Sequence, residues 1–522
     1  MTGTPSAHPV LGPGFSGLRA WLWVLALCGL GFMAGLLMNY FNPLMFLAAL
    51  LAALCLAGFV YFSVTYPLAM LCVVIARQIL MPVYIRLPGG IPPPLFLLAG
   101  LIAVVAAQKM LRPVPAPPGR YEQLIALALI FYNAALLISI PGEHASTASY
   151  LMLIKTGIIP TALFFIFVAT VRTPQHLSKV FFTIILAGAL CGILGLHEFM
   201  TGRNVLALFF SPQVTYEEDF FLWMLANPEE AQAYTEGSIY RVFSFFTQPL
   251  EYSTFMIMAF PFAFLSFVAA PSLGGKLLFG AVTALIFAGF IVSFSRGPTL
   301  ALALTVLFMG LFDRRVRVWI WLGAAGLMVG IVAYWPLIVE KIGQRVTGSE
   351  NITLRFSLWQ NGMEIFLQNP LRGIGFGSYP GYHVESIRAN QIGPMYEYSW
   401  AHIERVTTVE NIYISLAAET GLLGLLAFGF LITVTLTMFL RLHRHLSDDV
   451  SRRMNLASGT AILAYLLSGM TVANIIGYTI SILFLGVYCA ALAVLSRNLP
   501  QGQPPLYLRP ERRVPTQREP RR

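Results

Sequence analysis

Long uninterrupted apolar stretches recur along almost the whole chain, and they constrain the fold more than any other feature of the sequence. An apolar stretch of about 18 or more residues is long enough to cross a bilayer as a helix. The chain has 522 residues, of which 57% are hydrophobic and 11% charged, and its mean hydropathy is +0.73. This composition excludes a soluble globular protein. The sequence therefore predicts an all-α polytopic membrane protein, and its continuous, non-alternating runs exclude a transmembrane β-barrel.

The apolar stretches predict about fourteen transmembrane helices. They lie near 20–38, 44–62, 66–85, 92–108, 122–140, 149–170, 178–200, 249–270, 276–294, 298–312, 317–336, 411–440, 456–474 and 476–496. The Pro- and Gly-rich segment before the first span has no cleavage site typical of a signal peptide, so the first span is expected to be retained. The five cysteines all lie inside apolar runs, without the spacing of a zinc site or a disulfide framework. We therefore predict neither a metal nor a cofactor.

The basic residues predict the orientation of these spans. With fourteen spans, every second short connection is basic, and the tail from Arg497 adds seven arginines against two glutamates. The residues concerned are Lys109, Arg112, Arg120, Arg172, Lys179, Lys276, Arg314, Arg315, Arg317, Arg441, Arg444, Arg452 and Arg453. Since positive charge marks the cytoplasmic side of a membrane protein, both termini are predicted to be cytoplasmic.

The predicted spans divide the chain into seven regions. These are a cytoplasmic N-terminal tail (1–19), an N-terminal transmembrane bundle (20–200), an acidic outer loop (201–248), central transmembrane helices (249–336), a large outer loop (337–410), C-terminal transmembrane helices (411–496) and a basic disordered cytoplasmic tail (497–522). Because both long loops lie on the outer face, the activity of the protein is expected there.

An arginine stands at the membrane boundary in "SFSRGPTLAL", residues 293–302. Arg296 cannot lose its charge, and a lone charge in hydrocarbon costs several kcal/mol. We predict that Arg296 ends the ninth span and that Gly297 and Pro298 let the next helix begin. The free N–H groups of that helix, together with the guanidinium, would suit a phosphate. The alternative is a plain hairpin whose arginine reaches the lipid head groups, and the fragment alone supports both equally.

The large outer loop contains "NITLRFSLWQNGMEIFLQNPLRGIGFGSYPGY", residues 351–382. Its first half predicts an amphipathic helix in the outer interface, with Arg355 at its start and Trp359 as an interfacial anchor. Leu354, Leu358, Ile365 and Phe366 form its apolar side, and Gln360, Asn361, Glu364 and Gln368 its polar side. Pro370 is expected to end the helix, and "GIGFG" is expected to form a flexible turn.

The twelfth span begins within "HIERVTTVENIYISLAAETGLLGLLAFG", residues 402–429. Glu410 and Asn411 are predicted in its first turn, where a carboxylate is also favoured by the helix dipole alone. Asn411 and Glu419 are eight residues apart and share one stripe of the helix. Earlier in the chain, the segment "RVFSFFTQPLEYSTF", residues 241–255, places Arg241 just before the eighth span.

The order of three segments resembles the O-antigen ligase and O-antigen polymerase superfamily. They are "SRG" after an apolar span, "RFSLWQNGMEIFLQNPLRGIGFGSY" in a long outer loop, and "ENIYISLAAETGLLG" opening a helix. The similarity covers roughly residues 240–430. It implies a GT-C-like glycosyltransferase of a bacterial inner membrane, which works without metal at the periplasmic face on sugar chains carried by undecaprenyl diphosphate.

The resemblance also implies roles for residues. Arg296 and Arg355 are predicted to bind the carrier diphosphate, with Arg241 and Arg405 as secondary candidates. In the ligase branch the last segment usually begins with His-Asn, and the histidine is the proposed base, whereas this chain has Glu410 and Asn411. Glu410 is therefore our predicted general base, and Asn411 would orient it or the sugar. Trp359, Glu419 and His402 complete the predicted substrate-binding set, with His402 or His383 as an alternative base.

Because the histidine is absent, we favour a polymerase of exopolysaccharide or surface polysaccharide, which joins lipid-linked repeats. The alternatives are an O-antigen ligase, which transfers the finished glycan to another acceptor, and a non-catalytic transporter or flippase of lipid-linked glycans. Membrane lipids, the lipid-linked glycan and other assembly proteins, such as a flippase or a chain-length regulator, are the expected partners. No nucleic acid is expected.

Overall fold

The computed structural model describes residues 61–63, 65–80, 119–140, 146–204, 241–246, 248–333, 350–390, 409–471 and 478–499. All regular structure in these ranges is helical, and they contain no strand. The prediction of an all-α protein is confirmed for this part of the chain. The predicted spans 20–38, 44–62 and 92–108 lie wholly or almost wholly outside the described residues.

Among the described residues, seven helices are long and apolar enough to cross a membrane. They are α5 (Arg120–Ser139), the continuous helix Ser149–Thr170, α8 (Pro174–Thr201), α11 (Pro249–Ala269), α12 (Leu273–Ile291), α20 (Ile412–His445) and the continuous helix Thr479–Asn498. The second consists of α6 (Thr147–Leu153), η1 (Ile154–Ile158) and α7 (Ile159–Thr170), and the last of α22 (Tyr478–Ser481), η3 (Ile482–Tyr488), α23 (Cys489–Leu495) and η4 (Ser496–Asn498).

The remaining predicted spans also coincide with helices. These are the shorter apolar helices α3 (Pro67–Leu80) and α13 (Arg296–Phe312), together with α14 (Arg314–Ala333) and α21 (Asp449–Ser468). The described helices are those of a polytopic membrane protein.

Several helices begin and end at residues that the sequence marks for this purpose. Thr173 caps α8 by accepting a hydrogen bond from the amide of His176, and a proline follows it in the first helical position. Ser272 and Asp448 cap α12 and α21 in the same way. Gly202 ends α8 in the left-handed conformation, which glycine adopts without steric cost. These local signals explain why most predicted spans begin close to the observed helices, whereas the span predicted at 456–474 is α21, which begins earlier, at Asp449.

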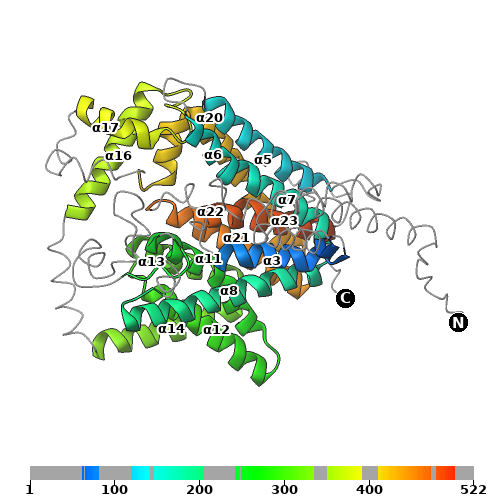
Figure 1. The fold of residues 1–522 in the computed structure, drawn as a ribbon. Helices are drawn as coiled ribbons and strands as arrows, with labels where there is room; N and C mark the ends of the chain where they lie inside the picture. Colours follow the sequence, from blue (N-terminus) through cyan, green and yellow to red (C-terminus); the bar gives the residue numbers. More distant parts are fainter. Residues whose placement is uncertain are drawn as a thin grey trace, which may run out of the picture.

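The last described span, Thr479–Asn498, lies in the centre of the bundle. Its most apolar window is 100% buried, whereas the corresponding window of α12 is only 17% buried. Figure 1 shows α22 and α23 between α5 and α7 on one side and α3 and α11 on the other. The exposed apolar residues of the outer helices, for example Leu277 and Leu311, are those expected to face lipid.

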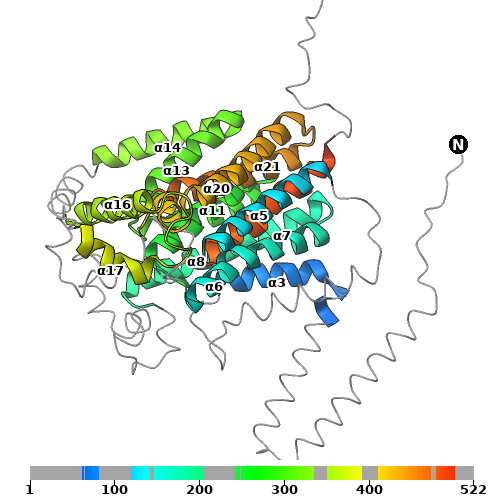
Figure 2. The same ribbon diagram turned by 90° about the horizontal axis from the view of Figure 1, so that it is seen from above.

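Two further helices, α16 (Glu350–Gln368) and α17 (Tyr379–Asn390), lie together at one end of the bundle (Figure 1 and Figure 2). The helix predicted for the first half of residues 351–382 is confirmed, and its place on the outer face stays a prediction. Its apolar side, with Leu358 and Ile365, is buried, and the helix packs against α20. The predicted polar side is wrong at Asn361, which is fully buried and hydrogen-bonds to Tyr379 and Ser386 of α17. Asn361 is buried because its side-chain amide joins α16 to α17.

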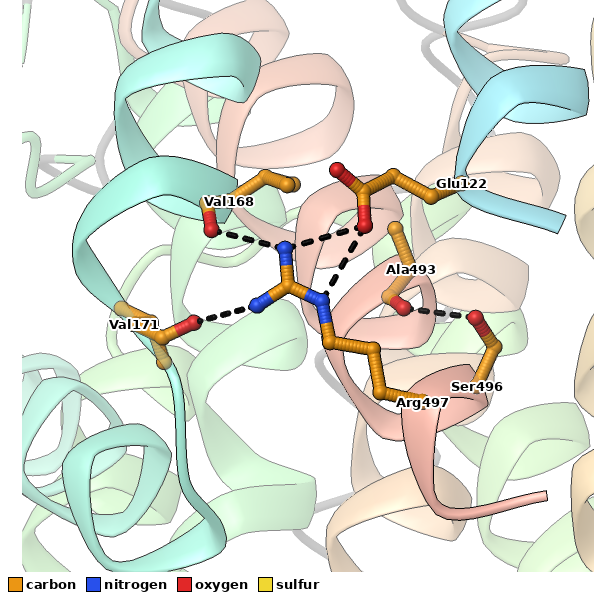
Figure 3. A network of polar contacts seen from close by, with 6 residues as sticks. All are labelled: Glu122, Val168, Val171, Ala493, Ser496 and Arg497. Atoms are coloured by element: carbon orange, nitrogen blue, oxygen red, sulfur yellow. Dashed lines mark hydrogen bonds and ion pairs between the residues drawn. The ribbon is translucent and has the colours of Figure 1, made fainter. Parts of the chain in front are cut away.

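The opposite end of the bundle is held by Arg497 (Figure 3). Its Nε and Nη2 atoms donate to Oε2 of Glu122, at 3.1 and 2.9 Å. The same guanidinium donates to the carbonyl oxygens of Val168 and Val171, at 2.9 and 3.2 Å. One side chain thus joins the final span to the start of α5 and satisfies carbonyl groups at the end of α7, which have no partner within their own helix.

We expect Arg497→Ala to lower the free energy of unfolding by roughly 2 kcal/mol, because it leaves the Glu122 carboxylate, 12% exposed, without its partner. Thermal unfolding of the detergent-solubilised protein measures the effect. The double variant with Glu122→Ala should be more stable than Arg497→Ala alone, since the unpaired carboxylate is then gone. Arg444→Ala, at an exposed arginine of the same end, serves as the control. Equal melting temperatures for Arg497→Ala and the wild type would contradict this account.

Candidate functional site

A glycine-rich loop, residues 370–377, docks into a break in α20. Within α20, Gly421 has φ 62° and ψ −157°, so the helix is interrupted there. Residues 418–423 offer the free backbone groups that such a break creates. Four backbone hydrogen bonds join the two segments: Ile374 N to Ala418 O (3.0 Å), Gly375 N to Glu419 O (3.0 Å), Leu422 N to Pro370 O (2.8 Å) and Leu423 N to Leu371 O (3.3 Å).

Glycine is required on both sides of this junction. Gly373 and Gly421 both have positive φ, and a Cβ atom on either would overlap the backbone of the other segment. Gly375 and Gly377 also have positive φ. The predicted turn is therefore present, but it is tightly packed rather than flexible. Pro370 follows the end of α16 as expected.

Glu419 fixes the glycine-rich loop through backbone hydrogen bonds. Its carboxylate accepts a hydrogen bond from the amide of Tyr379 (3.1 Å) and another from the amide of Gly377. The side chain is only 2% exposed. Glu419 thus positions the glycine loop and the start of α17, and its side chain does not lie on the accessible surface.

Arg355 and Glu410, predicted separately as a diphosphate ligand and a general base, form an ion pair. The distance between Nε of Arg355 and Oε2 of Glu410 is 2.8 Å, and their side chains are 32% and 34% exposed. Both groups are therefore accessible to a ligand. Glu410 has φ 54°, a conformation that costs energy for any residue other than glycine. The surrounding structure holds this carboxylate in a fixed place.

The prediction that Glu410 lies in the first turn of the helix is wrong, because α20 begins at Ile412. The N-cap is Asn411, whose Oδ1 atom accepts hydrogen bonds from the amides of Tyr413 and Ile414. Its Nδ2 atom donates to the carbonyl oxygen of Met470 at 3.0 Å. The amide is thus occupied by backbone partners at both ends, so Asn411 fixes the start of α20 and the place of Glu410.

The turn between α12 and α13 carries Arg296. Helix α12 ends at Ile291, and Arg296 is the first residue of α13, so it begins the second helix rather than ending the first. Pro298 lies in the first turn, as predicted. Arg296 is exposed, and it forms no hydrogen bond or ion pair with any residue in the described ranges. Its guanidinium is free for a ligand.

Arg241 lies against the same turn. Its Nε atom donates to the carbonyl oxygen of Ser293 (3.5 Å), and its Nη2 atom donates to Oγ of Ser295 (3.4 Å). Between these serines, Phe294 has φ 48°, which again is unusual for a residue with a side chain. Arg241 and Arg296 therefore flank one strained turn at the start of α13.

The end of α21 connects this turn to the Arg355–Glu410 pair. The carbonyl oxygen of Gly469 accepts from the amide of Ile412 (2.8 Å), next to the Asn411–Met470 bond. On the other side, a Cβ atom on Gly297 would overlap the side chain of Thr471. Contacts thus link the segment of Arg241 to the turn that carries Arg296, this turn to residues 469–471, and these residues to the segment of Glu410, which pairs with Arg355. Four of the predicted residues thus lie on four segments that are distant in sequence and linked by contacts in the structure.

Trp359 lies one helical turn after Arg355 on α16. Its ring meets that of Phe356 edge-on at 5.4 Å, and it packs against a buried cluster that includes Val409, the neighbour of Glu410. Its indole N–H is buried and has no hydrogen-bond partner among the described residues. Trp359 therefore contacts protein on one side, beside the ion pair, rather than acting only as an anchor in the interface.

Two predicted residues, His402 and Arg405, lie outside the described residues. The other loop histidine, His383, is fully buried, and its Nδ1 atom is 3.2 and 3.0 Å from the carbonyl oxygens of Tyr379 and Pro380. Its burial excludes it as a base on the accessible surface. Within the described ranges, no three His, Cys, Asp or Glu side chains are grouped closely enough to hold a metal ion.

Glu198, which was not among the predicted residues, positions the Arg241 segment. Its carboxylate accepts hydrogen bonds from the amides of Phe243 (3.3 Å) and Ser244 (2.8 Å), and the side chain is 1% exposed. Asn204 donates to the carbonyl oxygen of Ser244, which itself has φ 50°. A carboxylate near the end of the apolar span 178–200 was the signal that identifies such a residue.

The fold and this cluster define a polytopic membrane protein with a cationic site at one end of its bundle. Residues 281–429 match the family model described as O-antigen ligase. The match runs from within α12 to within α20 and includes the Arg296 turn, the Arg355–Glu410 pair and the glycine loop. It confirms the predicted resemblance to the O-antigen ligase/polymerase-like superfamily, whose members are glycosyltransferase-like enzymes. No curated protein matches the chain.

Proposed function

We propose that the protein is a periplasmic-face glycosyltransferase that polymerises lipid-diphosphate-linked oligosaccharide repeats in surface-polysaccharide or exopolysaccharide synthesis. The observation that carries this proposal is the Arg355–Glu410 ion pair, on a segment that contacts link to the segments of Arg296 and Arg241. A site that cleaves a sugar from a lipid diphosphate needs fixed cations for the leaving group and a base for the acceptor. These residues supply both.

In the proposed reaction, the acceptor hydroxyl attacks the anomeric carbon of the donor sugar. The bond between that carbon and the phosphate oxygen breaks, and its electron pair leaves with the lipid diphosphate. The proton of the hydroxyl passes to the carboxylate of Glu410. Arg296 and Arg355 stabilise the charge that develops on the leaving oxygen, and Arg241 supports the turn that presents Arg296.

The ion pair couples the two halves of this reaction. In the free protein, the Oε2 atom of Glu410 is engaged by Nε of Arg355 at 2.8 Å, so this oxygen is not open to an acceptor hydroxyl. A diphosphate carries more negative charge than a carboxylate and binds a guanidinium through two oxygens. Donor binding therefore draws Arg355 away from Glu410, and the base becomes available only when a donor is present.

The proposed location is a bacterial inner membrane, with both termini in the cytoplasm and the site on the periplasmic side. The basic ends of α5, α20 and the last described span support this orientation, because Arg441 and Arg497 lie beside the start of α5, at the end away from the Arg296 turn. We also propose that residues 249–336, 337–410 and 411–496 form the part that carries the site, with 1–200 as a supporting bundle.

Deletion of the protein in its host is expected to leave single-repeat lipid-linked glycans in the membrane, because the step that joins repeats is lost. Wild type should restore long chains, and Arg296→Ala should restore at most about one-hundredth of the wild-type rate. Arg203→Ala, at an exposed arginine at the end of α8, is the matched control and should restore full activity. Gel electrophoresis and mass spectrometry of the lipid-linked glycans measure the outcome. Accumulation of long chains on the carrier would instead indicate a ligase, and normal chains with Arg296→Ala would reject the proposed site.

A further inference from the structure

A second cationic site lies at the opposite end of the helices that carry the first one. It is a pocket of about 210 Å³, lined by Phe312, Asp313, Arg314, Arg315, His443, Asp449, Arg452, Arg453 and Leu456. Helix α13 runs from Arg296 to Phe312, and α21 runs back from Asp449 to Ser468. Helices of this length span about 25–30 Å, the thickness of the hydrocarbon core. The pocket therefore lies at the other membrane boundary, and it is independent of the proposed transferase site.

The arginines that line the pocket outnumber the carboxylates that could neutralise them. Asp449 pairs with Arg453 at 3.4 Å, and Asp313 accepts a hydrogen bond from the backbone amide of Arg315. The side chains of Arg314, Arg315 and Arg452 form no hydrogen bond or ion pair with any residue within the described part of the chain. Three guanidinium groups around one small pocket repel each other, so an anion bound among them would be strongly favoured.

His443 provides an independent indication of a ligand. Its side chain lines the pocket and is 9% exposed, and its ring lies 4.7 Å from the ring of Phe312 and 6.0 Å from that of Phe439. Its Nδ1 atom is buried and has no hydrogen-bond partner in the described structure. A buried polar atom without a partner is costly, and an oxygen of a bound anion would satisfy it when Nδ1 carries a proton.

The surface beside the pocket is apolar and exposed. Leu311, at the end of α13, is 75% exposed, and Val318 and Trp321, in the first turns of α14, are 58% and 74% exposed. In a membrane these side chains face acyl chains, and tryptophan favours the level of the head groups. If the anion in the pocket is the phosphate of a lipid, its acyl chains can therefore lie along α13 and α14.

We propose that this pocket binds the phosphate group of an anionic phospholipid, whose acyl chains lie against α13 and α14. Arg314, Arg315 and Arg452 bind the phosphate oxygens, and Nδ1 of His443 donates to one of them. The bound lipid joins the α13–α14 turn to the α20–α21 turn. Since α13, α20 and α21 also carry the first site at their other ends, the lipid stabilises the helices on which that site is built.

Thermal unfolding of the full chain in detergent tests this proposal. Phosphatidylglycerol is expected to raise the melting temperature by several degrees more than phosphatidylcholine with the same acyl chains. In Arg314→Gln/Arg452→Gln, the concentration of phosphatidylglycerol needed for half of this extra shift should rise about tenfold or more. Arg444→Gln removes an exposed arginine of the same end that does not line the pocket, and it should behave as the wild type.

The comparison is made between lipids within each variant, so a general loss of stability does not affect it. If the double variant does not fold, the exposed Arg315→Gln replaces it, with mass spectrometry of lipids retained on the intact protein as the readout. Equal shifts with the two lipids would overturn the proposal, and so would an unchanged phosphatidylglycerol dependence in the variants. An equal shift with inorganic phosphate alone would identify a site for free phosphate instead of a lipid.

Discussion

Arg355→Ala and Glu410→Gln are each expected to lower the turnover of a lipid-linked repeat by about 10²–10³-fold. Arg355→Ala removes a cation from the leaving group and leaves the carboxylate uncoupled from donor binding. Glu410→Gln keeps the shape of the side chain but cannot accept a proton. Because the two residues act on one transition state through one ion pair, the double variant should be much less impaired than the product of the single effects. Single-turnover kinetics with purified protein and lipid-linked donor measure all four forms.

The controls for this experiment come from the same end of the molecule. Glu364→Gln removes a half-buried carboxylate of α16 that is not paired with Arg355, and Arg203→Ala removes an exposed arginine at the end of α8. Both should turn over donor at nearly the wild-type rate. Arg355→Lys should keep part of the activity, since it retains the charge but not the two-pronged geometry. Full turnover by Glu410→Gln would remove Glu410 as the base.

Gly373→Val and Gly421→Val are expected to be the most destabilising single substitutions considered for this site. Each places a branched side chain at a positive φ and drives a Cβ atom into the backbone of the partner segment. For each substitution, the backbone strain and the steric overlap together are expected to cost roughly 3–5 kcal/mol of the free energy of unfolding, which is a large part of the stability of a typical domain. We expect loss of monodisperse protein, or a melting temperature lowered by many degrees, measured by size-exclusion chromatography and thermal unfolding.

A matched substitution lies a few residues away on α17. Gly381 is exposed, has no atom within 4 Å of the place of a Cβ, and does not have a positive φ. Gly381→Ala should leave the melting temperature unchanged or slightly higher, because alanine favours a helix. If Gly373→Val unfolded at the same temperature as Gly381→Ala, the loop would not be docked on α20 as described.

The positions of the helices could be read from the sequence because each depends on local information. The apolar length, the caps such as Thr173 and Asp448, and the Gly297–Pro298 step all act within a few residues. The amphipathic helix at 350–368 follows from its own periodicity. Two arginines, a carboxylate and an asparagine were predicted as members of one site because polar residues are rare at the ends of apolar spans, and their shared role stays a prediction.

Pairings between distant segments could not be read in this way. Periodicity shows that α16 has a buried face, but it does not show that Asn361 bonds to α17 or that Arg355 pairs with Glu410 across 55 residues of sequence. The interruption of α20 at Gly421 was hidden because it lies in a continuous apolar run, and only the docked loop provides the partners that make it stable. Glu198 was missed for the same reason, since its partners are backbone amides 45 residues away.

The central position of the helix Thr479–Asn498 has a consequence for biogenesis. This segment follows every other described span in the chain, yet it is enclosed by them on all sides. The earlier spans are therefore synthesised before their innermost neighbour. We therefore expect the bundle to close only when this segment enters and Arg497 reaches Glu122 at its edge.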